Sequence, residues 1–130
     1  MDPIIDQTTA LKGAKVLVVD DELLIALDVE DSVMRAGGET VGPYGTLSAT
    51  LSAIESESFS VAVLDVRLGR ETSEAAARRL KEKGIPFLFY TGQSLPERMQ
   101  DLASNTVVLM KPSPSRALVA ALNSLVTTEN

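Results

Sequence analysis

Two residue types are missing from the sequence, and their absence excludes several kinds of chemistry. The 130 residues include no cysteine and no histidine. Without cysteine, the chain has no disulfide framework, no thiolate zinc site and no cysteine nucleophile. Without histidine, it has no imidazole metal site and no Ser-His-Asp triad. Any nucleophile must therefore be a serine, threonine, lysine, tyrosine, aspartate or glutamate.

The chain also lacks an excess of basic charge and a long apolar run. Its net charge is −6, whereas nucleic-acid binders usually neutralise phosphates with a basic excess. The longest apolar run covers residues 117–122, far fewer than the roughly 20 that a membrane helix needs. The N-terminus has no cationic stretch followed by an apolar one, as a signal peptide would. We therefore predict a cytoplasmic protein that binds neither nucleic acid nor a membrane.

The length and composition of the chain suit one globular domain. Hydrophobic residues make up 45% of the sequence, which is ordinary for a folded protein and too high for a disordered one. A chain of this length builds a single core. We expect residues 1–13 to form an N-terminal tail, residues 14–127 the domain, and residues 128–130 a C-terminal tail.

Short apolar runs alternate with helical patterns along the domain. The β-branched run at 15–19 and the run at 61–64 are typical of buried parallel strands. Three further strands are expected at 39–44, 85–90 and 107–110. Helices are expected from 20–22 to Gly37, at 46–57, from Thr72 or Ser73 to Gly84, from a capping box at 94–97 to Ala103, and from Ser113 and Pro114 to Val126.

This alternation of strands and helices predicts the fold class. The first helix is expected because Leu23, Leu24, Leu27 and Met34 lie near helical spacing. Strict alternation of strand and helix implies a parallel sheet with helices on both faces. We predict an α/β fold of the flavodoxin-like type, with five parallel strands in the order 2-1-3-4-5 and five helices.

Polar residues that are able to bind a ligand or to react follow four of the five predicted strands. Asp20 and Asp21 follow the first strand, Asp65 the third, Thr91 the fourth and Lys111 the fifth. Each has an ordinary explanation by itself, as a helix cap, a loop carboxylate, a turn hydroxyl or a solvated strand end. Open parallel sheets, however, bind ligands beyond the carboxyl ends of their strands. The joint pattern therefore predicts one site at this edge.

The chemistry of these residues points to a hard metal ion and to phosphoryl transfer. Three clustered carboxylates repel one another unless a cation lies between them. Oxygen donors without histidine or cysteine favour Mg²⁺, which accepts a few carboxylates together with phosphate oxygens. A carboxylate beside Mg²⁺ can attack phosphorus and form an aspartyl phosphate. An ammonium and a hydroxyl would then stabilise the transferred phosphoryl oxygens.

Four short motifs carry a resemblance to a known family. They are Val-Val-Asp-Asp-Glu at 18–22, Leu-Asp-Val-Arg-Leu at 64–68, Phe-Tyr-Thr-Gly at 89–92 and Met-Lys-Pro at 110–112. With them, residues 14–126 resemble a response-regulator receiver domain of bacterial two-component signalling. The resemblance implies that Thr91 and Lys111 bind phosphoryl oxygens and that the peptide bond after Lys111 is cis.

The resemblance also assigns the phosphoacceptor and the metal ligands. Asp65 would accept the phosphoryl group. Asp21 would bind Mg²⁺ directly and Asp20 through water, with Asp65 itself and the backbone carbonyl of Arg67 completing the protein ligands. The donor would be a phosphohistidine of a sensor histidine kinase, which must lie on another chain because this one has no histidine.

Three departures from the common receiver pattern refine these expectations. The loop at 68–72 resembles receivers that are paired with HWE-type kinases, and residues 86–92 resemble the subgroup called FAT GUY. Val108 stands three residues before Lys111, where receivers usually carry an aromatic switch residue. We therefore expect a different reader of phosphorylation, a helix within 92–103 that is mobile without phosphate and ordered with it. The alternative is an ordinary helix that is packed in both states.

The predicted function is that of a stand-alone receiver that signals by protein contact or acts as a phosphate sink. One alternative is a flavodoxin-like FMN binder, although Asp-Asp-Glu after the first strand would repel the FMN phosphate. A second alternative is an aspartate-nucleophile phosphatase, which usually has an acid where this chain has Arg67. A third is a pseudo-receiver that only binds partners, and the intact acidic set argues against it.

Overall fold

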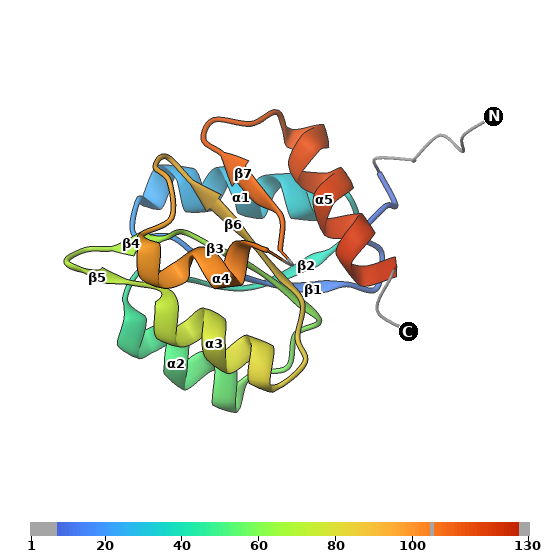
Figure 1. Cartoon of the computed structure of the whole chain (residues 1–130). Coiled ribbons are helices and arrows are strands. Elements are labelled where there is room, and N and C mark those ends of the chain that lie inside the picture. Colours follow the sequence, from blue (N-terminus) through green and yellow to red (C-terminus); the bar gives the residue numbers. More distant parts are fainter. Residues whose placement is uncertain (1–7, 105, 128–130) are drawn as a thin grey trace.

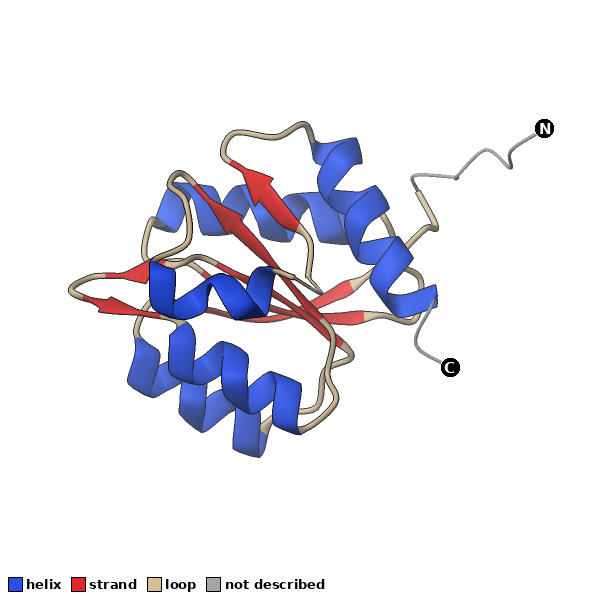
Figure 2. Cartoon of the chain, viewed as in Figure 1, coloured by secondary structure: helices blue, strands red, loops and turns tan. Residues whose placement is uncertain are grey.

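The computed structural model describes residues 8–104 and 106–127, which form a three-layer α/β arrangement (Figures 1 and 2). Five parallel strands make the main sheet, in the order β2-β1-β3-β6-β7. This is the predicted order 2-1-3-4-5, because β6 and β7 are the fourth and fifth strands of that sheet. Their bounds are β1 (Lys15–Val19), β2 (Glu39–Tyr44), β3 (Val61–Leu64), β6 (Phe87–Thr91) and β7 (Val108–Met110).

Helices cover both faces of the sheet, as predicted. They are α1 (Leu23–Arg35), α2 (Leu47–Ser56), α3 (Glu74–Glu82), α4 (Gln100–Ala103), which the 3₁₀ turn η1 (Glu97–Met99) precedes, and α5 (Ser115–Thr127). Figure 2 shows α1 and α5 on one face, with α2, α3 and α4 on the other. Each face has its own apolar cluster, and alternate residues of β6 belong to different clusters. None of the described helices is both long and apolar enough to cross a membrane.

Residues 65–72, between the third strand and the third helix that the sequence predicts, include regular structure that was not expected there. They contain an antiparallel hairpin made of β4 (Arg67–Leu68) and β5 (Glu71–Thr72), which projects beyond the sheet in Figure 1. Gly69 has a φ of 65°, a left-handed conformation that suits the tight turn. Two-residue strands are too short to leave a periodic pattern, so the sequence did not reveal them.

The residues that predicted α1 form its outer face. Leu23, Leu24, Leu27 and Met34 are exposed, whereas the side chains turned toward the sheet are small, with Ala26, Val29 and Val33 buried. Both stripes satisfy helical spacing, so periodicity alone identified the helix without telling which stripe meets the core.

Two of the predicted helix caps are wrong. The expected capping box at 94–97 does not form. The turn η1 follows Pro96 in its capping position, and no side chain caps it. Ser113 donates its hydroxyl hydrogen to the carbonyl of Met110 at 2.7 Å, and α5 begins only at Ser115. Thr46 does cap α2 by accepting a hydrogen bond from the backbone N–H of Ala49.

The start of α3 resolves the choice between the two caps that were expected there. The hydroxyl of Thr72 accepts a hydrogen bond from the backbone N–H of Glu74 at 3.4 Å. The side chain of Ser73 does not cap, and its buried hydroxyl has no partner among the described residues.

One residue of the expected N-terminal tail packs into the core. Leu11 is fully buried, and its backbone N–H donates to the carbonyl of Ala36 at 2.9 Å. The division at residues 13 and 127 stays a prediction, and residues 1–7 and 128–130 of the two expected tails lie outside the described residues.

Candidate functional site

Two buried aspartates lie side by side at the carboxyl edge of the sheet. Strands β1 and β3 pair in parallel so that Val19 is opposite Leu64, and each strand is followed directly by an aspartate. The backbone N–H of Asp65 also donates to the carbonyl of Val19. Asp20 and Asp65 are each only 5% exposed. The strand register therefore brings two acids together in a place where burial makes their charge costly.

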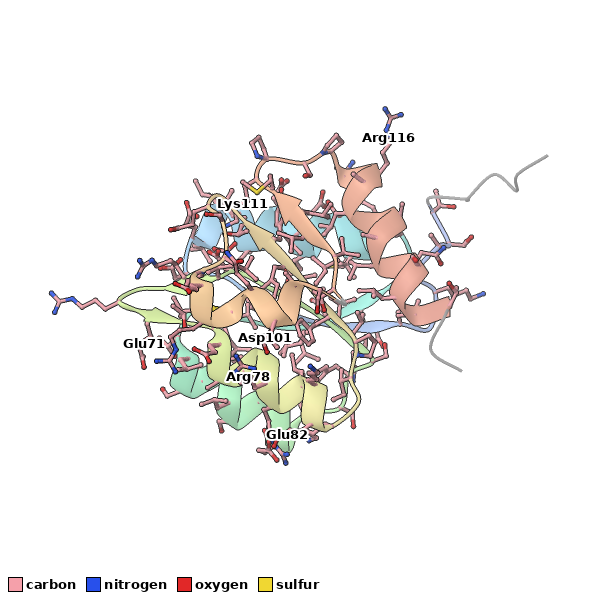
Figure 3. All side chains as sticks on the ribbon, viewed as in Figure 1. Glu71, Arg78, Glu82, Asp101, Lys111 and Arg116 are labelled. Atoms are coloured by element: carbon pink, nitrogen blue, oxygen red, sulfur yellow. The ribbon has the colours of Figure 1, made fainter. Side chains whose placement is uncertain are left out.

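A cation, the ammonium of Lys111, lies beside these two acids; Figure 3 labels Lys111 on the ribbon. It follows β7, and its Nζ lies 2.8 Å from Asp20 Oδ2 and 3.0 Å from Asp65 Oδ2. A third carboxylate, that of Glu22, lies 3.1 Å from the same nitrogen. Burial lowers the pKa of Lys111, but its hydrogen bonds to Asp20, Asp65 and Glu22 outweigh that effect and raise the pKa above its ordinary value.

The acidic side of the site carries more negative charge than Lys111 balances. Burial raises the pKa of Asp20 from 3.8 to about 6, and the charge of Asp65 adds to the increase. Hydrogen bonds from Lys111 and from the backbone N–H of Glu22 oppose it. An additional cation would lower this cost, because an opposite charge within a few ångströms favours the ionised form.

The carboxylates are close enough together to hold such a cation. Asp20, Asp21, Glu22 and Asp65 each offer an oxygen, and these four atoms all lie within 4.8 Å of one another. Asp21 Oδ2 accepts a hydrogen bond from the backbone N–H of Gly69 at 2.9 Å, which ties the β4–β5 hairpin to the site. A set of oxygen donors without nitrogen or sulfur fits a hard ion such as Mg²⁺.

Arg67 and Thr91 are less closely joined to this cluster. Arg67 begins β4 two residues after Asp65, and its role as a carbonyl ligand stays a prediction. Thr91 is buried at the end of β6, but its hydroxyl is engaged with its own loop. It donates to the carbonyl of Gln93 at 3.0 Å and accepts from the N–H of the same residue at 3.1 Å. The sequence indicated the position of Thr91 but not this orientation.

The loop after β7 holds Lys111 in place. The Lys111–Pro112 peptide bond is cis, as the family resemblance implied. The backbone N–H of Lys111 donates to the carbonyl of Thr91 at 2.8 Å. Two contacts of the site were not expected from the sequence, namely the ion pair of Glu22 and the packing of Tyr90 against Lys111, whose Nζ lies 5.9 Å from the ring centroid. Glu22 belongs to the Asp-Asp-Glu run, which was the available signal.

Comparisons with known proteins bear on the fold and on the sequence as a whole. No family model matches the chain. The transcriptional regulatory protein PdtaR of Mycobacterium tuberculosis is 29% identical over 117 residues, which are 87% of this chain and 57% of that protein. The chain thus spans little more than half the length of this curated relative.

Solved structures show the same fold. A CheY-like response regulator receiver domain protein from Methanospirillum hungatei JF-1 has a TM-score of 0.80 at 21% identity, covering 89% of this chain and 95% of that one. The response regulator PhyR from Brucella abortus has a TM-score of 0.76 at 26% identity, covering 89% of this chain and 49% of that one.

The fold is that of a known class of protein. The chain has the fold of response-regulator receiver domains, the class of signalling module to which its structural neighbours belong. It is similar to the regulators PdtaR and PhyR, at 29% and 26% identity. Membership of the FAT GUY subgroup stays a prediction.

Proposed function

We propose that Asp65 accepts a phosphoryl group from a phosphohistidine of a sensor histidine kinase in the presence of Mg²⁺. The observation that carries this proposal is the placement of Asp65 itself. Asp65 is 5% exposed and has Lys111 Nζ 3.0 Å from its carboxylate, with the oxygens of Asp20 and Asp21 within 4.8 Å. A carboxylate nucleophile, a cation and further carboxylate oxygens are thus gathered at one edge of the sheet.

The two oxygens of Asp65 have different surroundings, which favours attack by one of them. Oδ1 accepts a hydrogen bond from the backbone N–H of Val66 at 2.8 Å, whereas Oδ2 faces Lys111. In the proposed step, Oδ2 of Asp65 forms a bond to the phosphorus while the phosphorus–nitrogen bond of the donor breaks. The leaving imidazole keeps the electron pair of that bond and takes up a proton. Lys111 then neutralises the transferred phosphoryl oxygens.

Asp21 and Asp65 would hold Mg²⁺ directly, Asp20 would hold it through water, and the carbonyl of Arg67 would complete the set. When bound, the ion supplies positive charge that offsets the negative charge of the incoming phosphoryl group. The protein contributes the preorganisation, because the hairpin N–H of Gly69 and the N–H of Glu22 already orient Asp21 and Asp20. Thr91 would donate its hydroxyl to a phosphoryl oxygen after leaving the carbonyl of Gln93.

The partners belong to the same proposal. Receiver domains interact with histidine kinases and with downstream targets, and we propose an HWE-type kinase for this chain because of the loop at 68–72. The output would be a contact with another protein or the removal of phosphoryl groups from the kinase. A cytoplasmic site of action is consistent with a kinase donor.

The test uses acetyl phosphate and Mg²⁺ with the full chain, followed by mass spectrometry. Wild type should gain one phosphoryl group, and Asp65→Asn should gain none, because the amide keeps the shape of the carboxylate but is not a nucleophile. Asp28→Asn, on the exposed side of α1, is the matched control and should behave as wild type. Phosphorylation of Asp65→Asn at the wild-type yield would show that another residue is the acceptor.

A further inference from the structure

We propose that Tyr90 is a positioning residue for Lys111, an inference that rests on the proposed function. Tyr90 is the residue of β6 immediately before Thr91, and it is 6% exposed. Because consecutive strand residues point to opposite faces, its side chain enters the apolar cluster beneath α1 and α5, whereas Phe89 belongs to the other cluster. From there it reaches the loop that carries Lys111.

Two separate contacts join Tyr90 to that loop. Its ring centroid lies 5.9 Å from Lys111 Nζ, within the range of a cation–π contact. Its phenol oxygen accepts a hydrogen bond from the backbone N–H of Ser113 at 3.1 Å. One side chain therefore touches both ends of the segment from Lys111 to Ser113. The hydroxyl of Ser113 closes the same turn by donating to the carbonyl of Met110.

These contacts matter because a lysine side chain has much conformational freedom to lose. Holding the ammonium against Asp20 and Asp65 requires that several rotatable bonds of Lys111 be fixed. The Tyr90 ring restricts the space that the ammonium can occupy, and the phenol restricts the backbone from which the side chain starts. Lys111 binds the transferred phosphoryl oxygens in the proposed step, so its position sets how well that charge is stabilised.

The two contacts can be separated by substitution. Tyr90→Phe keeps the ring beside Lys111 and removes the acceptor for Ser113. Tyr90 and Ser113 both line a cleft of about 280 Å³ between α1 and α5, so water can reach the freed N–H and the effect should be moderate. Tyr90→Leu removes the ring as well, keeps an apolar side chain in the cluster, and should have the larger effect.

The experiment measures the phosphorylation rate at saturating acetyl phosphate, the affinity for beryllofluoride, and the Mg²⁺ concentration for half-maximal rate. Tyr90→Leu should lower the rate and the beryllofluoride affinity by about tenfold each. Tyr90→Phe should lower them by about threefold. The half-maximal Mg²⁺ concentration should stay within about twofold in both, because the metal-ligating carboxylates are untouched. Tyr44→Phe, a tyrosine that packs against the other cluster, is the matched control and should match wild type.

Several results would overturn the inference. One is a wild-type rate and beryllofluoride affinity in Tyr90→Leu. Another is a change in half-maximal Mg²⁺ as large as the change in rate, which would indicate general distortion of the site. If Tyr90→Leu does not fold, an unaltered Tyr90→Phe overturns the role of the hydrogen bond and with it the proposal. A wild-type chain that takes up no phosphoryl group would instead contradict the proposed function.

Discussion

The site has a charged half, whose side chains already contact one another, and a hydroxyl half, whose hydroxyl points into its own loop. The charged half consists of Asp20, Asp65 and Lys111, whose ammonium lies within 3.0 Å of both carboxylates. The hydroxyl half consists of Thr91 and the segment 92–103. Thr91 is fully buried, yet its hydroxyl forms hydrogen bonds with the backbone of Gln93 and not with the charged residues.

The difference follows from how the two groups are attracted. An ammonium is drawn to buried carboxylates over several ångströms, so Lys111 is in place before any phosphoryl group arrives. A neutral hydroxyl has no such attraction and satisfies its hydrogen bonds with the nearest backbone groups instead. The charged half is therefore ready for chemistry, and the hydroxyl half is the part that can respond to it.

The largest expected effect comes from removing the cation of the charged half. Lys111→Met keeps the length of the side chain but leaves nothing to neutralise the phosphoryl oxygens. We expect the phosphorylation rate with acetyl phosphate to fall by about 100-fold or more. Lys83→Met, which removes an ammonium from the end of α3, is the matched control. A Lys111→Met rate within about tenfold of wild type would mean that Lys111 is not needed for the transfer.

The second effect is a pH dependence of stability in the metal-free protein. Burial raises the pKa of Asp20 from 3.8 to about 6. At a pH between these two values, the folded chain therefore keeps a proton on Asp20 that the unfolded chain has lost. Stability should therefore fall as the pH rises from about 4 to about 6. The expected loss is about 1–2 kcal/mol, because solvent at the open edge screens part of the shift. Thermal melts of wild type and Asp20→Asn measure it, and the loss should be absent in Asp20→Asn.

Mg²⁺ should reverse this loss at neutral pH, and Asp21 provides the control. A ligand that binds only the folded chain stabilises it by mass action, by about 2.7 kcal/mol at a concentration 100 times its dissociation constant. Asp21→Ala should lose that response because it removes the carboxylate that we propose as a direct ligand. A flat Mg²⁺ titration in wild type, or an unchanged one in Asp21→Ala, would contradict the metal site.

The same contrast explains what the sequence could and could not predict. Strand positions and the parallel sheet followed from apolar runs and alternation. Parallel strands end at the same edge of a sheet, and Asp20, Asp65 and Lys111 lie there. The direction of the Thr91 hydroxyl was not predictable, because it depends on local backbone geometry at Gln93. A residue's position at the end of a strand can be predicted from the sequence. The direction in which its side chain points cannot.

Three other features of the structure could not be predicted from the sequence, because they too depend on contacts between distant residues or on the direction of side chains. The outer face of α1 carries the larger apolar residues, and periodicity could not tell which of the two stripes meets the core. The side chain of Glu22 contacts Lys111, a residue 89 positions away in the sequence. No local sequence pattern predicts that contact. Tyr90 touches Lys111 only because β6 and β7 are neighbours in the sheet.

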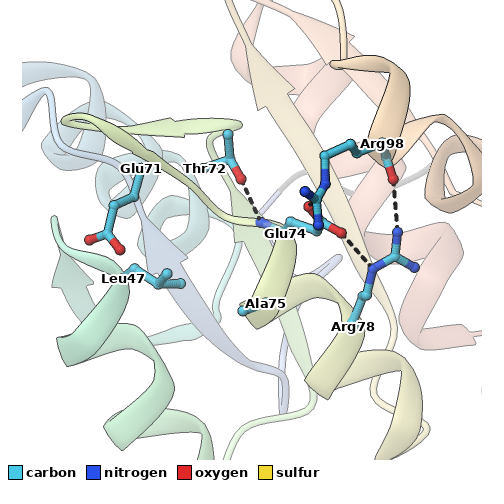
Figure 4. Close-up of a pocket in the computed structure, with 7 residues that line it drawn as sticks. All are labelled: Leu47, Glu71, Thr72, Glu74, Ala75, Arg78 and Arg98. Carbon is cyan, nitrogen blue, oxygen red and sulfur yellow. Dashed lines mark hydrogen bonds and ion pairs between the residues drawn. The ribbon is translucent and has the colours of Figure 1, made fainter.

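Segment 92–103 is held to the rest of the molecule by a thin set of contacts. Three of its own side chains are buried, those of Leu95, Met99 and Leu102. Its helix α4, however, is only one turn long. Arg78 of α3 holds it from outside, by hydrogen bonds to both carboxylate oxygens of Asp101 and to the carbonyl of Arg98. Figure 4 shows Arg78 joined to Arg98 and Glu74. These three residues help to line an open depression of about 380 Å³. These ionic contacts are exposed and individually weak.

The smallest expected effect is a change in the order of this segment, read by amide exchange with and without beryllofluoride. Once a phosphoryl mimic is bound, the Thr91 hydroxyl can donate to it while still accepting from the N–H of Gln93. Thr91 would then tie the start of the segment to the site. We predict that protection across 92–103 is lower than across α1 and α5 without the mimic and rises by at least about fivefold with it.

Arg78→Ala tests how much the outer contacts contribute to that order. Without the mimic, it should lower protection across 92–103 by less than about fivefold, because exposed ion pairs add little. Arg79→Ala is a matched control on the same helix, since Arg79 has the same exposed fraction of 41% but pairs with Glu55 of α2. It should leave 92–103 unchanged. If protection across the segment equals that of α1 and α5 in both states, the helix is permanently packed and the reader of phosphorylation must lie elsewhere.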